Sequence, residues 1–467
     1  MLKRLKNEFK LSDPVTTVLL WTIFAQAMLY LIFFVVLPQS WALIDDYWRM
    51  LRAVQPDFHF WPAFKESFSK SMSAGRFKPL NEIFMAVRMD LFSVDPRAYR
   101  FTQWLIVLGV HGLFYRIIRQ LGMSSFKALL GVLIASFALS TKEMILYWSI
   151  SEPLMLLCLF GSFSLFLSER LVGSYLLFIA AICTKEPAVG FLGVFALYAF
   201  LERKSVSRQQ KLYLGALAAS AVVFIVYVKS LPQVYTTNYT FARVSPALLF
   251  NAFVLPPLKN YAPLFFIGLL LIMRFGLKTH RNAVALGLSI VVGYTLVIVP
   301  WGPFDSWFYL HIPIPFGWAL IVVALWPEPT ASRESTKWHL ASLIGVASFA
   351  WLLTVNGASN YREFLTEAKH VADVMCEENV RNPRVPFYSN CQEAAEQLKH
   401  YLTLERRCKK LPDITHVPVG EFEKQIASRR ASYIFIYSSK CDYPISGLNT
   451  SYRNEFRYWT VYKNFGQ

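Results

Sequence analysis

The chain is dominated by apolar runs that alternate with short polar connectors. A helix needs roughly 20 mostly apolar residues to cross the hydrocarbon core of a bilayer. We expect about eleven runs of this kind to form membrane-spanning helices, although several are shorter than that length. They are residues 15–37, 101–118, 126–141, 153–168, 171–183, 187–201, 212–229, 261–277, 282–300, 312–326 and 338–355. The sequence therefore predicts an all-α, multi-pass membrane domain over residues 1–356.

The distribution of charge predicts the orientation of this domain. A net charge of +17 is compatible with a nucleic-acid partner, but the basic residues cluster in alternate connectors. This is the positive-inside pattern of membrane proteins, so we expect membrane lipids around the chain and no nucleic acid. The clusters are Lys3, Arg4 and Lys6; Arg116, Arg119 and Lys127; Arg203, Lys204, Arg208 and Lys211; Arg274, Lys278 and Arg281; and Arg333 and Lys337. They place the N-terminus in the cytosol and, after eleven crossings of the plasma (inner) membrane, the C-terminus on the exported side.

The segment 357–467 differs in character from the rest of the chain. Residues 392–407 have the periodicity of an amphipathic helix, and residues 432–437 and 457–462 are rich in aromatic and β-branched residues, as strands are. We expect a small, exported α/β domain, in which no catalytic motif is recognisable.

The cysteines support an exported location for this domain. Four of them lie in it, and an oxidising compartment would join them in two disulfides, in one of three pairings. A cytosolic domain with free thiols is the alternative. The four are Cys376, Cys391, Cys408 and Cys441, whereas Cys158 and Cys183 lie in apolar runs and are expected in the core.

The first outward loop, residues 38–100, is long and opens with an acidic motif. Asp45 and Asp46 follow the first apolar run directly, among Trp41, Tyr47 and Trp48. Adjacent carboxylates near membrane depth are costly to bury, and one of them can become a general base. The alternative is a pair of solvated loop acids. Residues 61–72 and 79–92 of the same loop have helical periodicity, which predicts helices at the membrane surface.

A basic segment, Gly75-Arg-Phe-Lys-Pro-Leu, lies between these two helices. The planar fork of Arg76 and the compact charge of Lys78 suit a phosphate group. The alternative is a turn whose charges face water or lipid headgroups.

A tripeptide occurs twice, as Thr141-Lys142-Glu143 and as Thr184-Lys185-Glu186. Each copy ends an outgoing span, so the two occupy equivalent ends of helical hairpins. Charges at membrane depth usually face a cavity and one another. The alternative is a self-paired Lys–Glu that only marks the end of a helix.

The late outward connector, residues 301–313, carries Asp305, Tyr309 and His311 in an otherwise apolar turn. His311 can bind a metal, transfer a proton or donate a hydrogen bond to phosphate, although an interfacial His is more often structural.

In this order, the four segments resemble the membrane glycosyltransferases of the C-type (GT-C) fold, which include the protein O-mannosyltransferases and the bacterial aminoarabinose transferases. The resemblance covers roughly residues 10–320 and rests on order and topology. It implies a sugar donor linked to a polyprenyl phosphate or diphosphate, and transfer to a glycan, lipid or protein acceptor on the non-cytosolic face. Asp45 or Asp46 would deprotonate the acceptor hydroxyl.

The resemblance also implies roles for the other residues. Arg76, Lys78, Lys142, Lys185, Tyr309 and His311 would bind the donor phosphate, and Glu143, Glu186 and Asp305 would support them. A divalent metal is used by some relatives, and Glu143, Glu186 and His311 could ligate one. Members often place an Arg before the Tyr of the late connector, whereas this chain has Phe308 before Tyr309. The alternative that the chain is a non-catalytic member of the family therefore stays open.

Two other functions are also compatible with the sequence. The paired Lys and Glu residues would also suit a transporter or flippase of lipid-linked sugars. A non-catalytic subunit of a glycan-assembly complex would use the exported domain as its binding module. The long first outward loop favours an enzyme with its site at the membrane surface.

Overall fold

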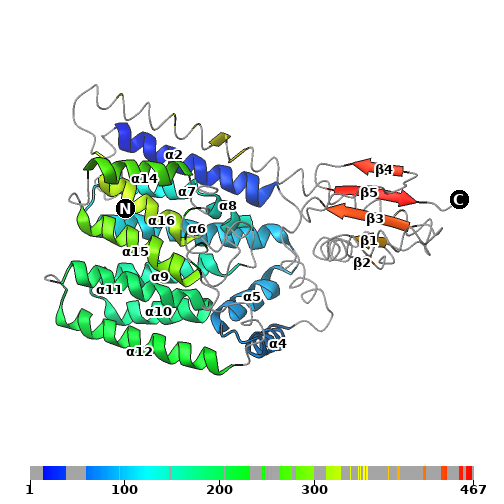
Figure 1. The fold of residues 1–467 in the computed structure, drawn as a ribbon, viewed down its shortest axis with the longest axis horizontal. Helices are drawn as coiled ribbons and strands as arrows, with labels where there is room; N and C mark the ends of the chain where they lie inside the picture. The colour runs from blue at the N-terminus through cyan, green and yellow to red at the C-terminus, as the bar shows by residue number, and fades with distance from the viewer. Residues whose placement is uncertain are drawn as a thin grey trace. The chain divides into compact units, whose positions relative to one another are not determined.

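A computed structural model describes residues 14–37, 59–93, 95–146, 150–203, 206–231, 262–275, 280–298 and 312–327, several isolated positions and the strands of the C-terminal segment (Figure 1). The chain divides into two compact units. The first comprises Met1–Leu37, Phe60–Arg88 and Arg97–Thr354, and the second comprises the remaining residues.

The first unit is helical throughout its described residues. It contains α4 (Phe60–Ser73) and the larger part of α5 (Pro79–Phe92), which match the two helices expected between residues 38 and 100. The apolar elements are α2 (Pro14–Tyr30) with the π-helix η1 (Leu31–Val36), α6 (Pro96–Gln120), α7 (Ser125–Ser136), α8 (Leu139–Leu146), α9 (Glu152–Leu167), α10 (Leu171–Thr184), the 3₁₀ helix η2 (Glu186–Phe191), α11 (Leu192–Leu201), α12 (Arg208–Ser230), α14 (Ala262–Phe275), α15 (Arg281–Ile298) and α16 (Pro313–Leu325).

Three of these elements are long and apolar enough to cross a membrane, namely Pro14–Val36, Pro96–Gln120 and Arg208–Ser230. A fourth span results if α7 and α8 are counted together, but the two helices are bent by 67°. The shorter apolar helices α9, α10, η2 with α11, α15 and α16 accompany them. The chain is therefore a multi-pass membrane protein, while eleven crossings stay a prediction.

The surface of α12 fits a lipid environment. Its large apolar side chains Val222, Val223 and Val226 are 59%, 69% and 64% exposed. Such exposure on one long helix is costly in water but is satisfied by lipid chains. The opposite side of α12 packs through Tyr213, whose hydroxyl lies 2.5 Å from Ser174 Oγ of α10. Figure 1 shows α10, α11 and α12 next to one another, in agreement with their contacts.

The closest helix packing in the first unit joins α15 and α16. A Cβ atom added at Gly287 would lie 2.6 Å from the carbonyl oxygen of Gly317, and one added at Gly317 would lie 2.7 Å from the carbonyl oxygen of Gly287. Small residues allow two backbones to approach in this way, and the dense packing replaces the weak hydrophobic driving force within a membrane. All thirteen residues of α16 are buried.

The second unit contains a five-stranded sheet in the order β2-β1-β3-β5-β4. Its strands are β1 (Phe387–Ser389), β2 (Ile414–His416), β3 (Tyr433–Ser438), β4 (Tyr452–Glu455) and β5 (Trp459–Asn464). β1 is parallel to β2 and β3, and β5 is antiparallel to β3 and β4. β3 and β5 overlap the two predicted strands, whereas the predicted helix 392–407 and the four cysteines of this segment lie outside the described residues. An α/β domain and its disulfides stay predictions.

We expect Gly287→Ala to destabilise the protein. Alanine is favoured over glycine within a helix by about 1 kcal/mol, but its methyl group would meet a backbone oxygen that no side-chain rotation can move. Overpacking of this kind costs about 1–3 kcal/mol. The apparent melting temperature in detergent should therefore fall.

Gly215→Ala on α12 is the matched control, because nothing lies within 4 Å of an added Cβ there. Its melting temperature should stay the same or rise. A Gly287→Ala variant as stable as this control would contradict the close contact between α15 and α16.

Candidate functional site

The described residues include six of the eleven side chains that the sequence singles out. The six are Arg76, Lys78, Lys142, Glu143, Lys185 and Glu186, and all belong to the first unit. The other five, Asp45, Asp46, Asp305, Tyr309 and His311, lie outside the described residues, and their placement stays a prediction.

The basic segment is positioned by the way in which α4 ends. The backbone N–H of Arg76 donates to the carbonyl of Ser71 at 2.9 Å, and that of Gly75 donates to the carbonyl of Met72 at 3.0 Å. These two bonds form a Schellman motif, which needs a left-handed residue after the last helical one. Gly75 supplies it with a φ of 78°. The motif fixes where the backbone of Arg76 leaves the helix.

Carboxylates hold both cations of this segment. Arg76 Nε lies 3.5 Å from Glu186 Oε1, and Lys78 Nζ lies 3.0 Å from Glu82 Oε1. Arg76 and Glu186 are 110 positions apart in the sequence, so folding brings the segment between α4 and α5 to the second Thr-Lys-Glu motif. The two segments that the sequence treats separately therefore form one cluster.

Phe77, which lies between the two cations in the sequence, packs against aromatic rings of two helices. Its ring centroid lies 5.1 Å from that of Tyr227 and 6.1 Å from that of Phe224, both on α12, and 6.0 Å from that of Phe68 on α4. Aromatic pairs at these separations attract beyond their buried area. Ion pairs and ring contacts thus hold Arg76-Phe77-Lys78 against four different elements: η2, α12, α4 and α5.

Lys185 does not pair with its neighbour Glu186. Its ammonium forms an ion pair and hydrogen bond with Glu152 Oε1, at the start of α9. Lys185 has an extended backbone, with φ −160° and ψ 136°, and Glu186 is the first residue of the 3₁₀ helix η2. The self-paired alternative for the second motif is therefore wrong: Lys185 faces Glu152, and Glu186 faces Arg76.

The first motif lies on α8, just beyond the bend after α7. Lys142 and Glu143 are 8% and 9% exposed. The Oε2 atom of Glu143 is buried and has no hydrogen-bond partner within the described part of the chain. Burying a charge costs free energy, and charged residues inside membrane segments usually have a function. The burial of Glu143 therefore keeps it among the candidate site residues.

Several buried charges were not singled out from the sequence. Glu152 is fully buried, Glu82 is 1% exposed, and Arg88 and Arg100 are 2% and 0% exposed. Arg88 donates to the carbonyl of Tyr99 at 2.6 Å, and its guanidinium lies 4.8 Å from the ring centre of Phe84. A signal for Glu152 was present, because it is a lone carboxylate at the start of an apolar run. Glu82, Arg88 and Arg100 lie in stretches with enough polar residues to be taken for surface.

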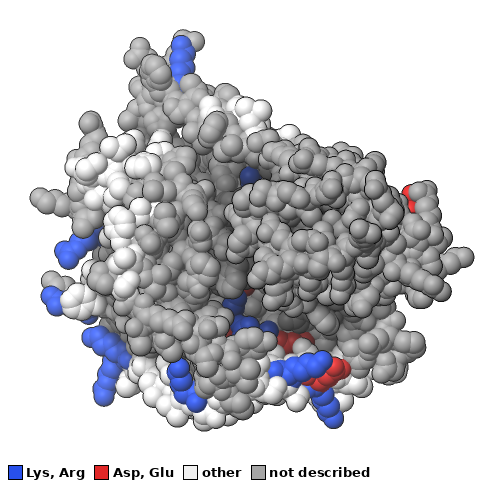
Figure 2. All heavy atoms as spheres, turned by 45° about the vertical axis from the view of Figure 1, so that its right-hand side comes forward, with Lys and Arg blue, Asp and Glu red and all other residues white. Residues whose placement is uncertain are grey.

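Charged side chains also gather on the surface. On the face drawn in Figure 2, Lys and Arg side chains collect along the lower edge, with Asp and Glu side chains next to some of them. One exposed pair of this kind is Lys70–Glu66 on α4, where Lys70 Nζ lies 2.7 Å from Glu66 Oε1 and the side chains are 75% and 40% exposed. Such a pair contributes little to stability, in contrast to the buried pairs of the cluster.

The described residues contain no group of three or more His, Cys, Asp or Glu side chains that could hold a metal ion. Glu143 and Glu186, two of the ligands expected from the resemblance, are among the residues searched. The third, His311, lies outside them.

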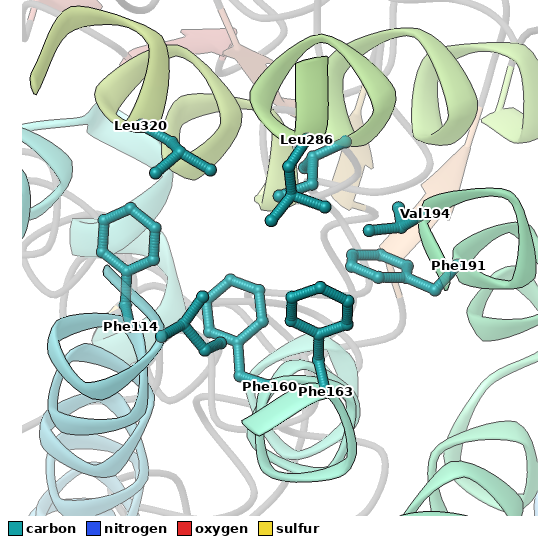
Figure 3. A pocket seen from close by; sticks show the side chains of 9 residues that line it. Phe114, Phe160, Phe163, Phe191, Val194, Leu286 and Leu320 are labelled. Atoms are coloured by element: carbon teal, nitrogen blue, oxygen red, sulfur yellow. The ribbon is translucent and has the colours of Figure 1, made fainter. Parts of the chain in front are cut away.

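A pocket inside the helical unit has an entirely apolar lining. It is formed by Phe114, Ile117, Phe160, Phe163, Phe191, Val194, Leu286, Ile290 and Leu320. Figure 3 shows the labelled side chains pointing into one space between α6, α9, η2, α11, α15 and α16. With no polar group to stabilise a charge, this pocket cannot bind a phosphate. The charged cluster around Arg76, and not this pocket, is the candidate site for a charged ligand.

Comparison with known proteins finds structural counterparts but no match by sequence. No family model matches the chain, and no curated protein matches its sequence. The chain is similar in structure to ArnT from Cupriavidus metallidurans, an aminoarabinose transferase solved bound to undecaprenyl phosphate. The two share 13% identity over 96% of this chain and 98% of that one, with a TM-score of 0.49. ArnT is of the class that the sequence resembles, but a likeness of this size does not assign an activity.

We expect Glu152→Gln to destabilise the protein strongly. The change removes the carboxylate that the buried ammonium of Lys185 contacts, and breaking a buried ion pair from one side costs about 3–5 kcal/mol. The apparent melting temperature in detergent measures the effect. The double variant Glu152→Leu with Lys185→Met should regain much of the loss, since it removes both charges.

Glu66→Gln, which breaks the exposed pair on α4, is the control and should cost no more than about 0.5 kcal/mol. Equal effects of Glu152→Gln and Glu66→Gln would contradict a buried pair at the start of α9.

Proposed function

We propose that the protein is a membrane glycosyltransferase that moves a sugar from a polyprenyl-phosphate-linked donor to an acceptor on the non-cytosolic face. The observation that carries this proposal is the ion pair between Arg76 and Glu186. It brings the basic segment of the long first loop to the second Thr-Lys-Glu motif, next to helices that are suited to a membrane. Cations at this position can meet the phosphate of a lipid whose chain stays in the bilayer.

The proposed reaction is a displacement at the anomeric carbon of the donor sugar. Asp45 or Asp46 accepts the proton of the acceptor hydroxyl, and the hydroxyl oxygen forms the new glycosidic bond. The bond between the anomeric carbon and the phosphate oxygen breaks, and its electron pair leaves with the lipid phosphate. A poor nucleophile needs the carboxylate, and the departing anion needs cations.

The cations of the cluster have unequal parts in this proposal. Arg76 and Lys78 bind and stabilise the leaving phosphate, since their side chains are partly accessible (32% and 11% exposed). Lys185 is neutralised by Glu152, and we assign it mainly to the support of Glu186. Lys142 and Glu143 on α8, together with Asp305, Tyr309 and His311, remain candidates for binding the sugar, the phosphate or a divalent metal.

The proposal includes a location and an orientation. We place the protein in the plasma (inner) membrane, with a cytosolic N-terminus and an exported C-terminal segment whose four cysteines form two disulfides. The acceptor is a glycan, a lipid or a protein. The exported segment would recognise the acceptor or a partner protein.

One observation favours a transporter of lipid-linked sugars as the second candidate. The helices α7 and α8 are bent by 67° at a break that contains neither Gly nor Pro, and transporters often bind substrate at broken helices. A transporter would depend on Lys142 and Glu143 at this break, and it would tolerate the loss of both Asp45 and Asp46. An enzyme would not tolerate the loss of its general base.

We expect Arg76→Met and Lys78→Met each to weaken the binding of undecaprenyl phosphate about ten-fold. A hydrogen bond to a charged group contributes about 1.5–3 kcal/mol, and 1.4 kcal/mol is ten-fold in affinity. Native mass spectrometry or thermophoresis of the purified protein in nanodiscs measures the Kd. Undecaprenol, which lacks the phosphate, should bind all variants alike.

Lys70→Met is the matched control, because it removes one positive charge from the same loop at an exposed position. Its Kd should equal that of the wild type. If Arg76→Met and Lys70→Met have the same Kd, the basic segment does not bind the phosphate.

A further inference from the structure

Glu82 is the most heavily bonded carboxylate among the described residues of the loop helices. It lies in the first turn of α5, and its side chain is 1% exposed. Its Oε1 forms an ion pair with Lys78 Nζ at 3.0 Å and accepts hydrogen bonds from Ser71 Oγ at 3.2 Å and from Asn81 Nδ2 at 3.4 Å. Its Oε2 accepts from Ser67 Oγ. The carboxylate is thus fixed from two helices, since Ser67 and Ser71 belong to α4.

Comparison with a neighbouring ion pair of the same spacing shows that Lys78–Glu82 differs from an exposed surface pair. Lys70–Glu66 and Lys78–Glu82 both join residues four positions apart, but the first is exposed and the second has side chains only 11% and 1% exposed. Exposed pairs contribute little. Burying Glu82 without its several hydrogen bonds would be costly, so these bonds are what allow a carboxylate at this position.

The bonds of Glu82 also determine where the ammonium of Lys78 lies. A lysine ammonium is a point charge on a flexible four-carbon stem, and it has three N–H donors. The ion pair with Glu82 fixes where the end of this stem lies. The serines of α4 hold Glu82, and Glu82 holds Lys78, whereas Arg76 is placed independently by the Schellman motif at the end of α4.

We propose that Glu82 is a positioning residue that holds Lys78 in place to bind the phosphate of a lipid-linked donor. The inference rests on the proposed function of the basic segment and adds a residue to it. Glu82 itself is negative and repels phosphate, so its effect comes from ordering the lysine before the ligand arrives. Preorganisation of this kind raises affinity because less side-chain entropy is lost on binding.

A double-mutant cycle on Lys78 and Glu82 tests the proposal. The Kd for undecaprenyl phosphate is measured on the full-length protein in nanodiscs, for the wild type, Glu82→Gln, Lys78→Met and the double variant. Glu82→Gln should raise the Kd about ten-fold. In the Lys78→Met background the same change should have no further effect, because residues that act as one unit are not additive. A purely structural role would add its effect in both backgrounds.

Glu82→Asp keeps the test valid if Glu82→Gln does not fold. It keeps the charge but is shorter by one methylene, so it cannot reach both Lys78 and the serines of α4. Its Kd should rise several-fold in the wild-type background only. Glu66→Gln, which removes an exposed carboxylate from the same loop, should leave the Kd unchanged.

The outcomes separate this inference from the proposed function. A Lys78→Met variant that weakens binding, combined with a Glu82→Gln variant that binds as well as or more tightly than the wild type, overturns the role of Glu82 alone. Additive effects in the double variant overturn it as well. An unchanged Kd for Lys78→Met overturns the phosphate site itself, and the role of Glu82 with it.

Discussion

The buried ion pair between Lys185 and Glu152 is the interaction on which the rest of the site depends. It neutralises a cation at the end of α10 with a carboxylate at the start of α9, in a region where an unpaired charge would be costly. Lys185 contacts Glu152, and the next side chain, Glu186, contacts Arg76. These two neighbouring residues thus join the helical core to the segment that carries Arg76.

Several different contacts hold the basic segment in place. The Schellman motif sets the exit of Arg76, the aromatic rings of α12 hold Phe77, and Glu82 holds Lys78. Phe77 contacts a helix with a lipid-suited surface, while the residues on both sides of it are cations. This alternation places charges suited to a phosphate directly beside apolar groups suited to the chain that carries it.

Periodicity and composition predict much of the helical unit. Long apolar runs such as 15–37, 101–118 and 212–229 appear as helices of the expected kind, because length and hydropathy alone decide whether a segment can span a bilayer. The run 126–141 does not continue as one straight helix, since α7 ends at Ser136 and the chain bends before Lys142. Apolar content does not reveal such a bend.

The pairing of charges could not be predicted, for a different physical reason. Adjacency in the sequence suggests that Lys185 pairs with Glu186, but tertiary contacts give each residue another partner, Glu152 for Lys185 and Arg76 for Glu186. Glu82 was missed because four residues of separation from Lys78 are typical of exposed helix pairs. Its burial depends on α4, which the local sequence does not show. The acidic motif Asp45-Asp46 and the late connector lie outside the described residues, so their predicted roles rest on the sequence.

The central claim is that this protein transfers a sugar with the help of Asp45 or Asp46. Its most direct test is a mass-spectrometric profile of lipid-linked and surface glycans in a deletion strain. The strain is complemented with the wild type, Asp45→Asn, Asp46→Asn or the exposed-site control Glu66→Gln, at matched expression. We predict that one glycan lacks a single sugar in the deletion strain, and that the wild type and Glu66→Gln restore it while at least one Asn variant does not. Full restoration by both Asn variants would contradict the account and favour a transporter or a non-catalytic subunit.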